Sequence, residues 1–363
     1  MQYFCIVQRQ LILTSLVWAM YALSLLYTNT CNAQALYKTE QGKELYAEAQ
    51  SAFKAKSYGS AINLMRYCVG EEPDNPFFHC ELARAYMLNA NLGMAAFLVE
   101  KAIELPTADE ATFAFAATVH TQAASFDNAR KVLNKGLELF PNSGMLYEAK
   151  GNLYFIFEKD EDALKFWEKG IKKDPSFPAN YYHLAKQEIT VNENIVKTIL
   201  LAETYVLMEP MSVRSNEMKK LLYDAYNRMF QAMYNGNDIA KGLSGKASAS
   251  RGSLQKSLCQ VYENNKYMLV GGLTDNNIIM FRMRFLLDWT NAYKDTYPLA
   301  MVSHLQTLVA EGHFETYNRW IFGNLMNEER FSHWYAENAD SYQNFIKYIA
   351  EHKLVPQNGQ YYF

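Results

Sequence analysis

Between residues 42 and 176 the pattern of small and large side chains repeats every 34 positions. One column of this repeat holds only alanine, at Ala61, Ala95, Ala129 and Ala163. Two further columns hold only small residues: Cys68, Ala102, Gly136 and Gly170 in one, and Ala49, Ala83, Ala117 and Gly151 in the other. Small residues are needed where two helices pack closely, so each period predicts a pair of antiparallel helices.

Larger residues occupy the positions between the small columns, and prolines mark the ends of the periods. One of these columns holds Tyr58, Leu92, Phe126 and Asp160, and another holds Met65, Val99, Leu133 and Trp167. Pro73, Pro141 and Pro175 close three periods, and Pro106 closes the second one residue early. Proline cannot continue a helix and disfavours one just before it, so each period ends in a turn.

This pattern resembles the tetratricopeptide repeat (TPR) over about residues 42–176. The fourth repeat matches best, through Tyr147, Gly151, Tyr154, Ala163, Trp167, Gly170 and Pro175. A fifth repeat is weaker: Tyr181, Leu184 and Ala185 match a first helix, but the alanine column falls on Lys197 and Pro210 comes one residue late. We therefore predict an all-α fold that starts with a helical-hairpin solenoid of four clear repeats and one degenerate repeat, closed by residues 192–209.

In the TPR family the first helices of the repeats line a concave groove, and the resemblance implies a peptide or protein ligand there. The predicted groove residues mix basic, amide and aromatic side chains, which suits an extended peptide of some acidic character. They are Lys43, Tyr46, Phe53, Arg84, Met87, Leu88, Thr118, Thr121, Glu148, Asn152, Phe155, Tyr182 and Lys186. The alternative is that these residues are ordinary surface or contact the C-terminal half. The family's clamp for a terminal carboxylate is not reproduced, because Glu148 stands where it needs a lysine.

Beyond residue 210 the repeat stops but the helical periodicity continues. An apolar stripe at spacings of three and four predicts a helix over residues 214–234 that caps the last repeat: Met218, Leu221, Leu222, Ala225, Met229 and Met233. Gly242 to Ser253 reads as a linker, and it lacks the residues of a phosphate-binding loop. Residues 254–353 are expected to form five or six helices rich in aromatic core residues, in a region that resembles no characterised family.

The first residues have the pattern of a secretory signal peptide. Arg9 precedes an apolar run, and Ala33-Gln34-Ala35 provides a small-x-small cleavage site. An uncleaved membrane anchor is the alternative, whereas Cys31 lacks the usual lipoprotein context. We predict a signal peptide over 1–35, a TPR solenoid over 36–210, a capping helix and linker over 211–252, and a helical domain over 253–363. The expected location is the periplasm or cell envelope, with membrane contact only through an uncleaved signal segment.

Charge and cysteine content change this picture little. Without residues 1–35 the chain has 34 basic and 38 acidic residues, a formal charge of −4 that gives no basic face for nucleic acid. The remaining cysteines, Cys68, Cys80 and Cys259, are too sparse for a disulfide framework, and a bridge between the first two is not expected. No histidine or cysteine spacing matches a metal site, and we expect no cofactor.

Catalytic signals in the sequence are weak, so we predict a non-enzymatic interaction scaffold. The sharpest alternative is a polar set in the C-terminal half that would act on a glycan or peptide by acid–base catalysis: His313, Glu315, Glu328, Glu329 and His333. No spacing enforces a shared geometry for this set, and no serine-nucleophile motif is present. A third reading is a glycan-binding protein that uses tryptophan and tyrosine faces.

Overall fold

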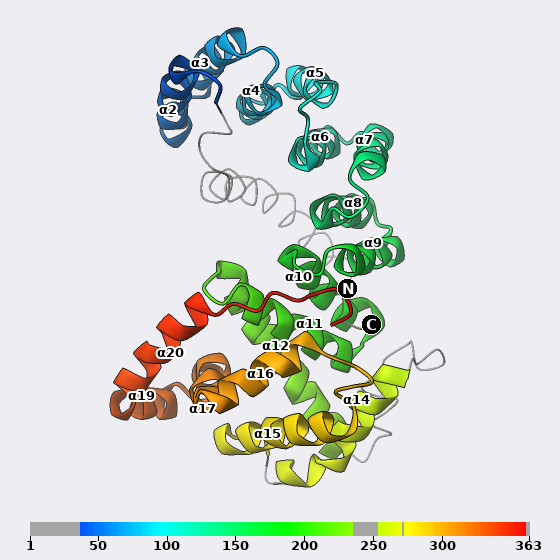
Figure 1. The fold of residues 1–363 in the computed structure, drawn as a ribbon, viewed down its shortest axis with the longest axis vertical. Coiled ribbons are helices and arrows are strands. Elements are labelled where there is room, and N and C mark those ends of the chain that lie inside the picture. Colours follow the sequence, from blue (N-terminus) through cyan, green and yellow to red (C-terminus); the bar gives the residue numbers. More distant parts are fainter. Residues whose placement is uncertain (1–36, 235–252, 271, 361–363) are drawn as a thin grey trace. The chain divides into compact units, whose positions relative to one another are not determined.

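The structure is a computed structural model that describes residues 37–234, 253–270 and 272–360. Every regular element in these ranges is helical, which confirms the all-α prediction (Figure 1). The expected signal peptide and most of the linker-like stretch lie outside the described residues. No helix within those ranges combines the length and the apolar character needed to cross a bilayer.

The repeat region folds as successive helical hairpins. The first unit of the chain holds α2 (Glu40–Lys54), α3 (Tyr58–Glu71), α4 (Pro76–Leu88), α5 (Leu92–Ile103), α6 (Glu110–Gln122), α7 (Phe126–Leu139) and α8 (Gly144–Ile156), and α9 (Asp160–Lys173) begins at its end. Two helices of the next repeat follow, α10 (Pro178–Gln187) and α11 (Ile195–Met208). The second helices α3, α5, α7 and α9 begin 34 residues apart, as the sequence predicts.

The small columns lie where the helices pack most closely. Ala61, Ala95, Ala129 and Ala163 are each 0% exposed. A Cβ atom added at Gly136 would lie 2.9 Å from the Cβ of Phe113, so this position holds glycine because α6 and α7 approach each other there. The predicted reason for the small columns, close helix contact, is therefore confirmed. The result is a TPR-type solenoid.

A left-handed residue closes the turn between the two helices of every repeat. These residues are Lys56, Ala90, Ala124, Glu158 and Glu193, with φ between 54° and 62°. The first four are 34 residues apart and the last is 35 residues on. Each turn therefore accepts the modest cost of a left-handed conformation at a residue other than glycine.

One inserted residue explains the weak sequence match of the fifth repeat. A π-helical turn, η2 (Glu188–Asn192), follows α10, and such turns arise from a single insertion into an α-helix. Counting 35 residues from Ala163 leads to Thr198, which is 0% exposed, and not to Lys197. The fifth hairpin is thus complete, and its second helix begins at Ile195 instead of Asn192.

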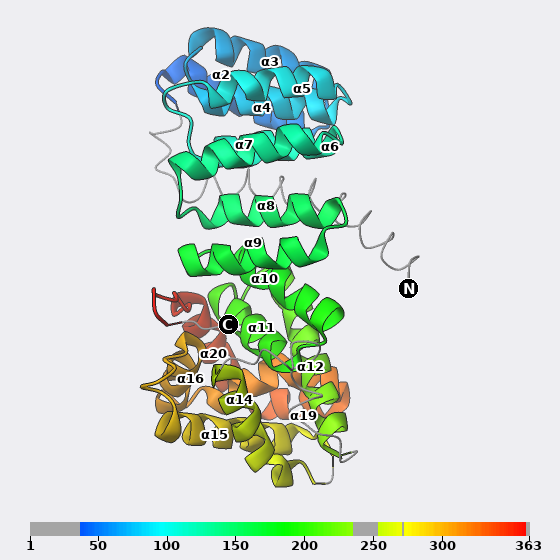
Figure 2. The ribbon, with the colours of Figure 1, turned by 90° about the vertical axis from the view of Figure 1, so that its right-hand side faces the viewer.

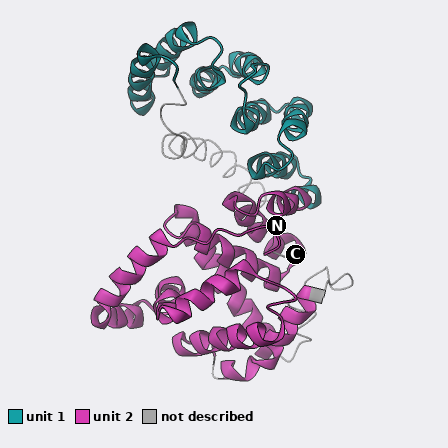
Figure 3. Cartoon of the chain, viewed as in Figure 1, with its two compact units in different colours: residues 1–163 teal, residues 164–363 magenta. Residues whose placement is uncertain are grey.

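The second compact unit, residues 164–363, contains the end of the solenoid and the C-terminal helices, whereas residues 1–163 form the first (Figure 3). Its further elements are α12 (Val213–Tyr234), α14 (Ser253–Asn264), η4 (Lys266–Leu269), α15 (Asp275–Ala292), α16 (Ala300–Ala310), α17 (Phe314–Asn318), η5 (Arg319–Gly323), α18 (Asn324–Met326), α19 (Glu328–Glu337) and α20 (Ala339–Glu351). The division follows packing density, so it groups the last repeat with the helices that cover it. The boundary predicted at residue 210 marks where the repeat pattern of the sequence ends, not where the packing changes. It stays a prediction.

Helix α12 packs on α10 and α11, as predicted for a cap, and buries Met218, Leu222, Ala225, Met229 and Met233. Helices α14 and α16 also contact α11 (Figures 1 and 2). The chain then returns to this helix, because the amide of Leu354 donates to the carbonyl of Leu207 at 3.0 Å. The C-terminal half is therefore stacked on the last repeat.

A buried polar network fixes this stacking. Arg282 of α15 forms an ion pair with Glu203 of α11, and both side chains are at most 3% exposed. The hydroxyl of Tyr317 donates to the same carboxylate at 3.0 Å, and Arg282 also donates to the amide oxygen of Asn318 at 2.6 Å. Burial lowers the pKa of Arg282 to about 10, so the guanidinium stays charged at neutral pH.

Candidate functional site

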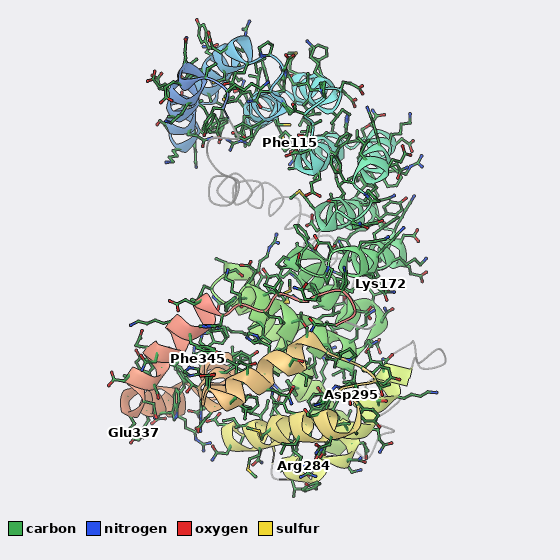
Figure 4. The ribbon with its side chains drawn as sticks, in the orientation of Figure 1. Phe115, Lys172, Arg284, Asp295, Glu337 and Phe345 are labelled. Carbon is green, nitrogen blue, oxygen red and sulfur yellow. The ribbon has the colours of Figure 1, made fainter. Side chains whose placement is uncertain are left out.

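Within the first unit, α4, α6 and α8 lie along the inner side of the row of hairpins and α3, α5 and α7 along the outer side (Figures 1 and 2). The inner helices carry most of the predicted groove residues. We call the side chains that α2, α4, α6 and α8 turn away from their partner helices the inner face of the first unit, or inner face for short. Figure 4 labels one of these residues, Phe115 of α6.

The first part of the inner face is a buried network centred on Glu81. The hydroxyl of Tyr46 donates to its carboxylate at 3.2 Å, and Gln50 donates to the same oxygen at 3.3 Å. Arg84 forms an ion pair with this carboxylate and stacks its guanidinium 3.9 Å above the ring of Phe53. Burial, with a contribution from Glu81, raises the pKa of the Tyr46 hydroxyl, so tyrosine remains the proton donor.

The same arrangement recurs four periods later in the second unit. Tyr182 donates to Glu217 at 2.7 Å, and Lys186 donates to the same oxygen at 3.1 Å. These three residues lie 136 positions after Tyr46, Gln50 and Glu81 in that order, or four repeats of 34. The separation of 35 residues between tyrosine and glutamate is the same in both networks, so α12 presents Glu217 to α10 as α4 presents Glu81 to α2.

The two networks differ in exposure. The side chain of Glu81 is 9% exposed, whereas that of Glu217 is 49% exposed. Burial acts to raise the pKa of Glu217, but the hydrogen bond from Tyr182 and the charge of Lys186 outweigh it, so this pKa lies below its usual value. Arg214 lies 4.8 Å from the ring centre of Tyr182, so this network of the second unit carries charged groups that reach the surface.

In the middle repeats the predicted groove residues bond within their own helices. The hydroxyls of Thr118 and Thr121 donate to the carbonyls four residues earlier, at 3.0 and 2.7 Å. The amide of Asn152 donates to Glu148 at 2.7 Å, so it is engaged by a carboxylate of its own helix. Lys43, at the start of the row, is exposed and pairs with Glu40 at 2.9 Å.

Burial separates the predicted groove residues into two groups. Eight are buried: Tyr46, Phe53, Arg84, Met87, Thr121, Asn152, Phe155 and Tyr182. Five reach the surface in part or fully: Lys43, Leu88, Thr118, Glu148 and Lys186. The structure places Tyr182 and Lys186 in the second unit and the others in the first. Partner binding by these residues stays a prediction.

Sequence reasoning missed the glutamates that organise both networks. Glu81 and Glu217 each lie 35 residues after the tyrosine that they bind, and the two pairs are four repeat periods apart. A search for polar pairs at one period plus one residue would have found them. Without it, Arg84 looked like a ligand-binding base, although it is 4% exposed.

The candidate catalytic set of the C-terminal half is divided between different environments. His313 packs against the rings of Tyr348 and Phe345, with centroids 4.5 and 6.0 Å apart. His333 lies 3.8 Å from Glu337 on the exposed face of α19. Glu315 pairs with Arg319 at 3.5 Å, while Glu328 and Glu329 stand in the first turn of α19. Of these residues, His333 lines a cleft beside α15.

Cysteine and metal chemistry contribute no site within the described residues. Cys68, Cys80 and Cys259 form no disulfide with one another, and burial raises the pKa of Cys68 to about 11. A thiol with a raised pKa is mostly protonated at neutral pH and is a poor nucleophile. No group of three histidine, cysteine or acidic side chains suited to a metal ion occurs in the part of the chain that the structure describes.

Comparison with known proteins gives no family for this chain. No family model matches it, and no curated protein matches it. A structure of MamA from Desulfovibrio magneticus RS-1 aligns with a TM-score of 0.35 and 15% identity, covering 52% of this chain and 98% of MamA. Human IFIT1, as a dimer with m7Gppp-AAAA, aligns with a TM-score of 0.39 and 19% identity over 83% of this chain and 62% of its own. The fold assignment rests on the helix pairs of this chain itself.

Proposed function

We propose that this chain is a non-enzymatic scaffold that binds a protein or peptide on its inner face and acts in the periplasm or cell envelope. The proposal rests on the observation that, within each repeat, different residues make the helix contacts and form the inner face. Small residues at fixed intervals make the helix contacts, as the fully buried alanine column illustrates. The inner face is free of that constraint and carries different side chains in every repeat, which is how solenoids recognise extended partners.

Hydrogen bonds hold several inner-face residues in fixed positions. Arg84 is fixed by Glu81 and Phe53, and Asn152 by Glu148. A surface that is already ordered loses less conformational entropy when it binds, so such fixation supports a binding role. The partly exposed Leu88 and Thr118, on the neighbouring helices α4 and α6, are the residues best placed to contact a partner.

Charge pairing revises the expected chemistry of the partner. Lys43, Arg84 and Lys186 each pair with a carboxylate of this chain. These pairs cancel most of the positive charge that an acidic peptide would need. We therefore propose a partner of mixed polarity that contacts apolar and hydroxyl groups, and we keep nucleic acid outside the proposal because the chain carries a net charge of −3.

The test compares two double variants with two acidic substitutions each. Leu88→Glu with Thr118→Glu alters the inner face, and Phe97→Glu with Leu139→Glu alters exposed residues of the outer helices α5 and α7. Arg84 is left unchanged, because its removal would strand the buried Glu81 and destabilise the fold. After chemical crosslinking in the producing cells, the inner variant should lose partners that the outer variant retains. Equal sets of partners from both variants would contradict the proposal.

A further inference from the structure

A cleft in the second unit has the features of a small-molecule site. It encloses about 470 Å³ between the start of α15, η5 and α19. That volume lies within the usual range for binding sites of small ligands, about 300 to 1,000 Å³. Its lining combines an indole ring with hydrogen-bond donors and acceptors, some of them charged. The lining residues are Thr274, Asp275, Asn276, Arg319, Arg330, His333, Trp334 and Glu337. Figure 4 labels Glu337 on α19.

Local packing explains why α19 lies so close to η5. A Cβ atom added at Gly323 would lie 2.5 Å from the ring of Phe331, so glycine lets this ring pack directly on the π-helical turn. Phe331 in turn stacks on Trp334, with ring centroids 6.0 Å apart. The tryptophan is therefore held in place from one side while it lines the cleft.

Arg319 is the fixed polar centre of the cleft. Its guanidinium lies 3.2 Å from Asp275 and donates to the amide oxygen of Asn276 at 3.0 Å. Its side chain is 13% exposed, and its Nε–H has no hydrogen-bond partner among the described residues. The guanidinium also lies 5.6 Å from the ring centre of Trp334, so the polar centre and the aromatic face are adjacent.

Arg330 differs from the other charged residues of the lining. Asp275 is neutralised by Arg319, and Glu337 lies 3.8 Å from His333. Arg330 is exposed on α19 and forms no ion pair with any described residue. The lining of the cleft thus contains one arginine without an ion pair among the described residues, Arg330, together with an aromatic ring and a fixed set of hydrogen-bonding groups.

We propose that this cleft binds a pyranose sugar that carries a carboxylate, with the ring stacked on Trp334 and the carboxylate on Arg330. Sugar hydroxyls both donate and accept, so they can satisfy the mixed set of Asp275, Asn276 and Arg319. The C–H face of a pyranose carries partial positive charge and matches the negative face of an indole ring. A charge-assisted hydrogen bond to Arg330 adds the preference for an acid.

Other ligand classes fit this cleft less well. A di- or triphosphate would bring several negative charges to a lining in which Arg330 is the arginine without an ion pair among the described residues, and the carboxylate of Glu337 would add repulsion. A purely apolar ligand would desolvate Arg319 and Asn276 without giving them hydrogen bonds, at a cost of about 1 to 3 kcal/mol for each group. The proposal is independent of partner binding on the inner face, because the cleft uses none of the inner-face residues.

The experiment uses the full chain labelled with 5-fluorotryptophan and observed by fluorine NMR. The Trp334 resonance is assigned by its loss in Trp334→Phe, a replacement that keeps an aromatic ring against Phe331. Glucuronate should shift this resonance with saturation, glucose should do so about tenfold more weakly, and acetate should have no effect. Polyglucuronate oligomers, tested alongside, distinguish a free acidic sugar from the end of a glycan.

Two variants separate the acidic preference from the sugar site. Arg330→Met should reduce the glucuronate affinity about tenfold and leave the glucose affinity unchanged within about twofold, as expected for loss of one charge-assisted bond. Arg228→Met, an exposed arginine of α12, is the control and should change neither. Equal affinities for glucose and glucuronate in the unaltered chain would overturn the role of Arg330. A Trp334 resonance that no sugar shifts would overturn the site.

Discussion

Tyr46 and Tyr182 occupy the same position in repeats four periods apart, and each donates its hydroxyl to a glutamate 35 residues further along the chain. In both cases the residue four positions later, Gln50 or Lys186, donates to the same carboxylate oxygen. The first network is buried and the second is partly exposed. One structural solution for linking neighbouring inner helices is thus used both near the start and at the end of the solenoid.

Close packing at Gly136 and open space at Gly70 predict opposite effects on stability when each glycine is replaced by alanine. Gly136→Ala should lower the free energy of unfolding by about 1 to 3 kcal/mol, because the new methyl group would clash with the Cβ of Phe113. Gly70→Ala is the matched change in α3, where nothing lies within 4 Å of the added atom. It should raise the free energy of unfolding by about 0.5 to 1 kcal/mol. Urea unfolding followed by circular dichroism measures both, and a stabilising Gly136→Ala would contradict the account.

The buried pair Arg282 and Glu203 predicts strong non-additivity. Arg282→Met alone should cost about 3 to 5 kcal/mol, because it leaves the Glu203 carboxylate buried without its counter-charge. Adding Glu203→Gln should restore much of that loss, since the amide is neutral and can still accept from Tyr317. The measurement is a double-mutant cycle by urea unfolding. Additive losses in the double variant would show that the pair does not act as a unit.

Lys219 predicts an unusual pH dependence of stability. Its ammonium group lies 3.2 Å from the ring centre of Trp320 and forms no ion pair with a described residue, and burial lowers its pKa to about 7 from 10.5. Between these two values the unfolded chain binds more protons, so this group makes stability rise with pH from about 7 to 10.5. Below pH 7 both states are protonated and its contribution is constant.

Thermal unfolding between pH 7 and 9.5 tests this dependence. Lys219→Met keeps an unbranched side chain against Trp320 and should remove the rise that Lys219 contributes. Lys220→Met, at the exposed neighbouring position, should leave the profile of the unaltered chain in place. Identical profiles for Lys219→Met and the unaltered chain would mean that Lys219 keeps its ordinary pKa in the fold.

Periodicity in the sequence was enough to predict the hairpins, because close helix contact imposes a local requirement for small residues. Ala61 and Ala129 could be identified as packing residues without any knowledge of their neighbours. The fifth repeat was harder, since the insertion in η2 shifts the alanine column from Lys197 to Thr198. The position of Pro210, 35 residues after Pro175, already indicated the insertion, because it is displaced by the same single residue.

The polar sites depend on contacts between distant residues, and no local pattern encodes them. Arg282 and Glu203 are 79 residues apart, and each looks like an ordinary surface residue of an amphipathic helix. The cleft likewise brings together three segments, around residues 274–276, 319 and 330–337. The sequence offered His333 only within an alternative catalytic set, and the structure places it in the lining of the cleft together with Arg330, Trp334 and Glu337.

The most direct test of the scaffold proposal is site-specific photocrosslinking in living cells. A benzophenone amino acid is placed at Leu88 or at Thr118 on the inner face, and at Phe97 on the outer helix α5 as the control. The proposal predicts that both inner positions crosslink to the same discrete partner protein and that Phe97 does not. Crosslinking to that partner from Phe97 alone, or no discrete product from either inner position, would contradict binding on the inner face.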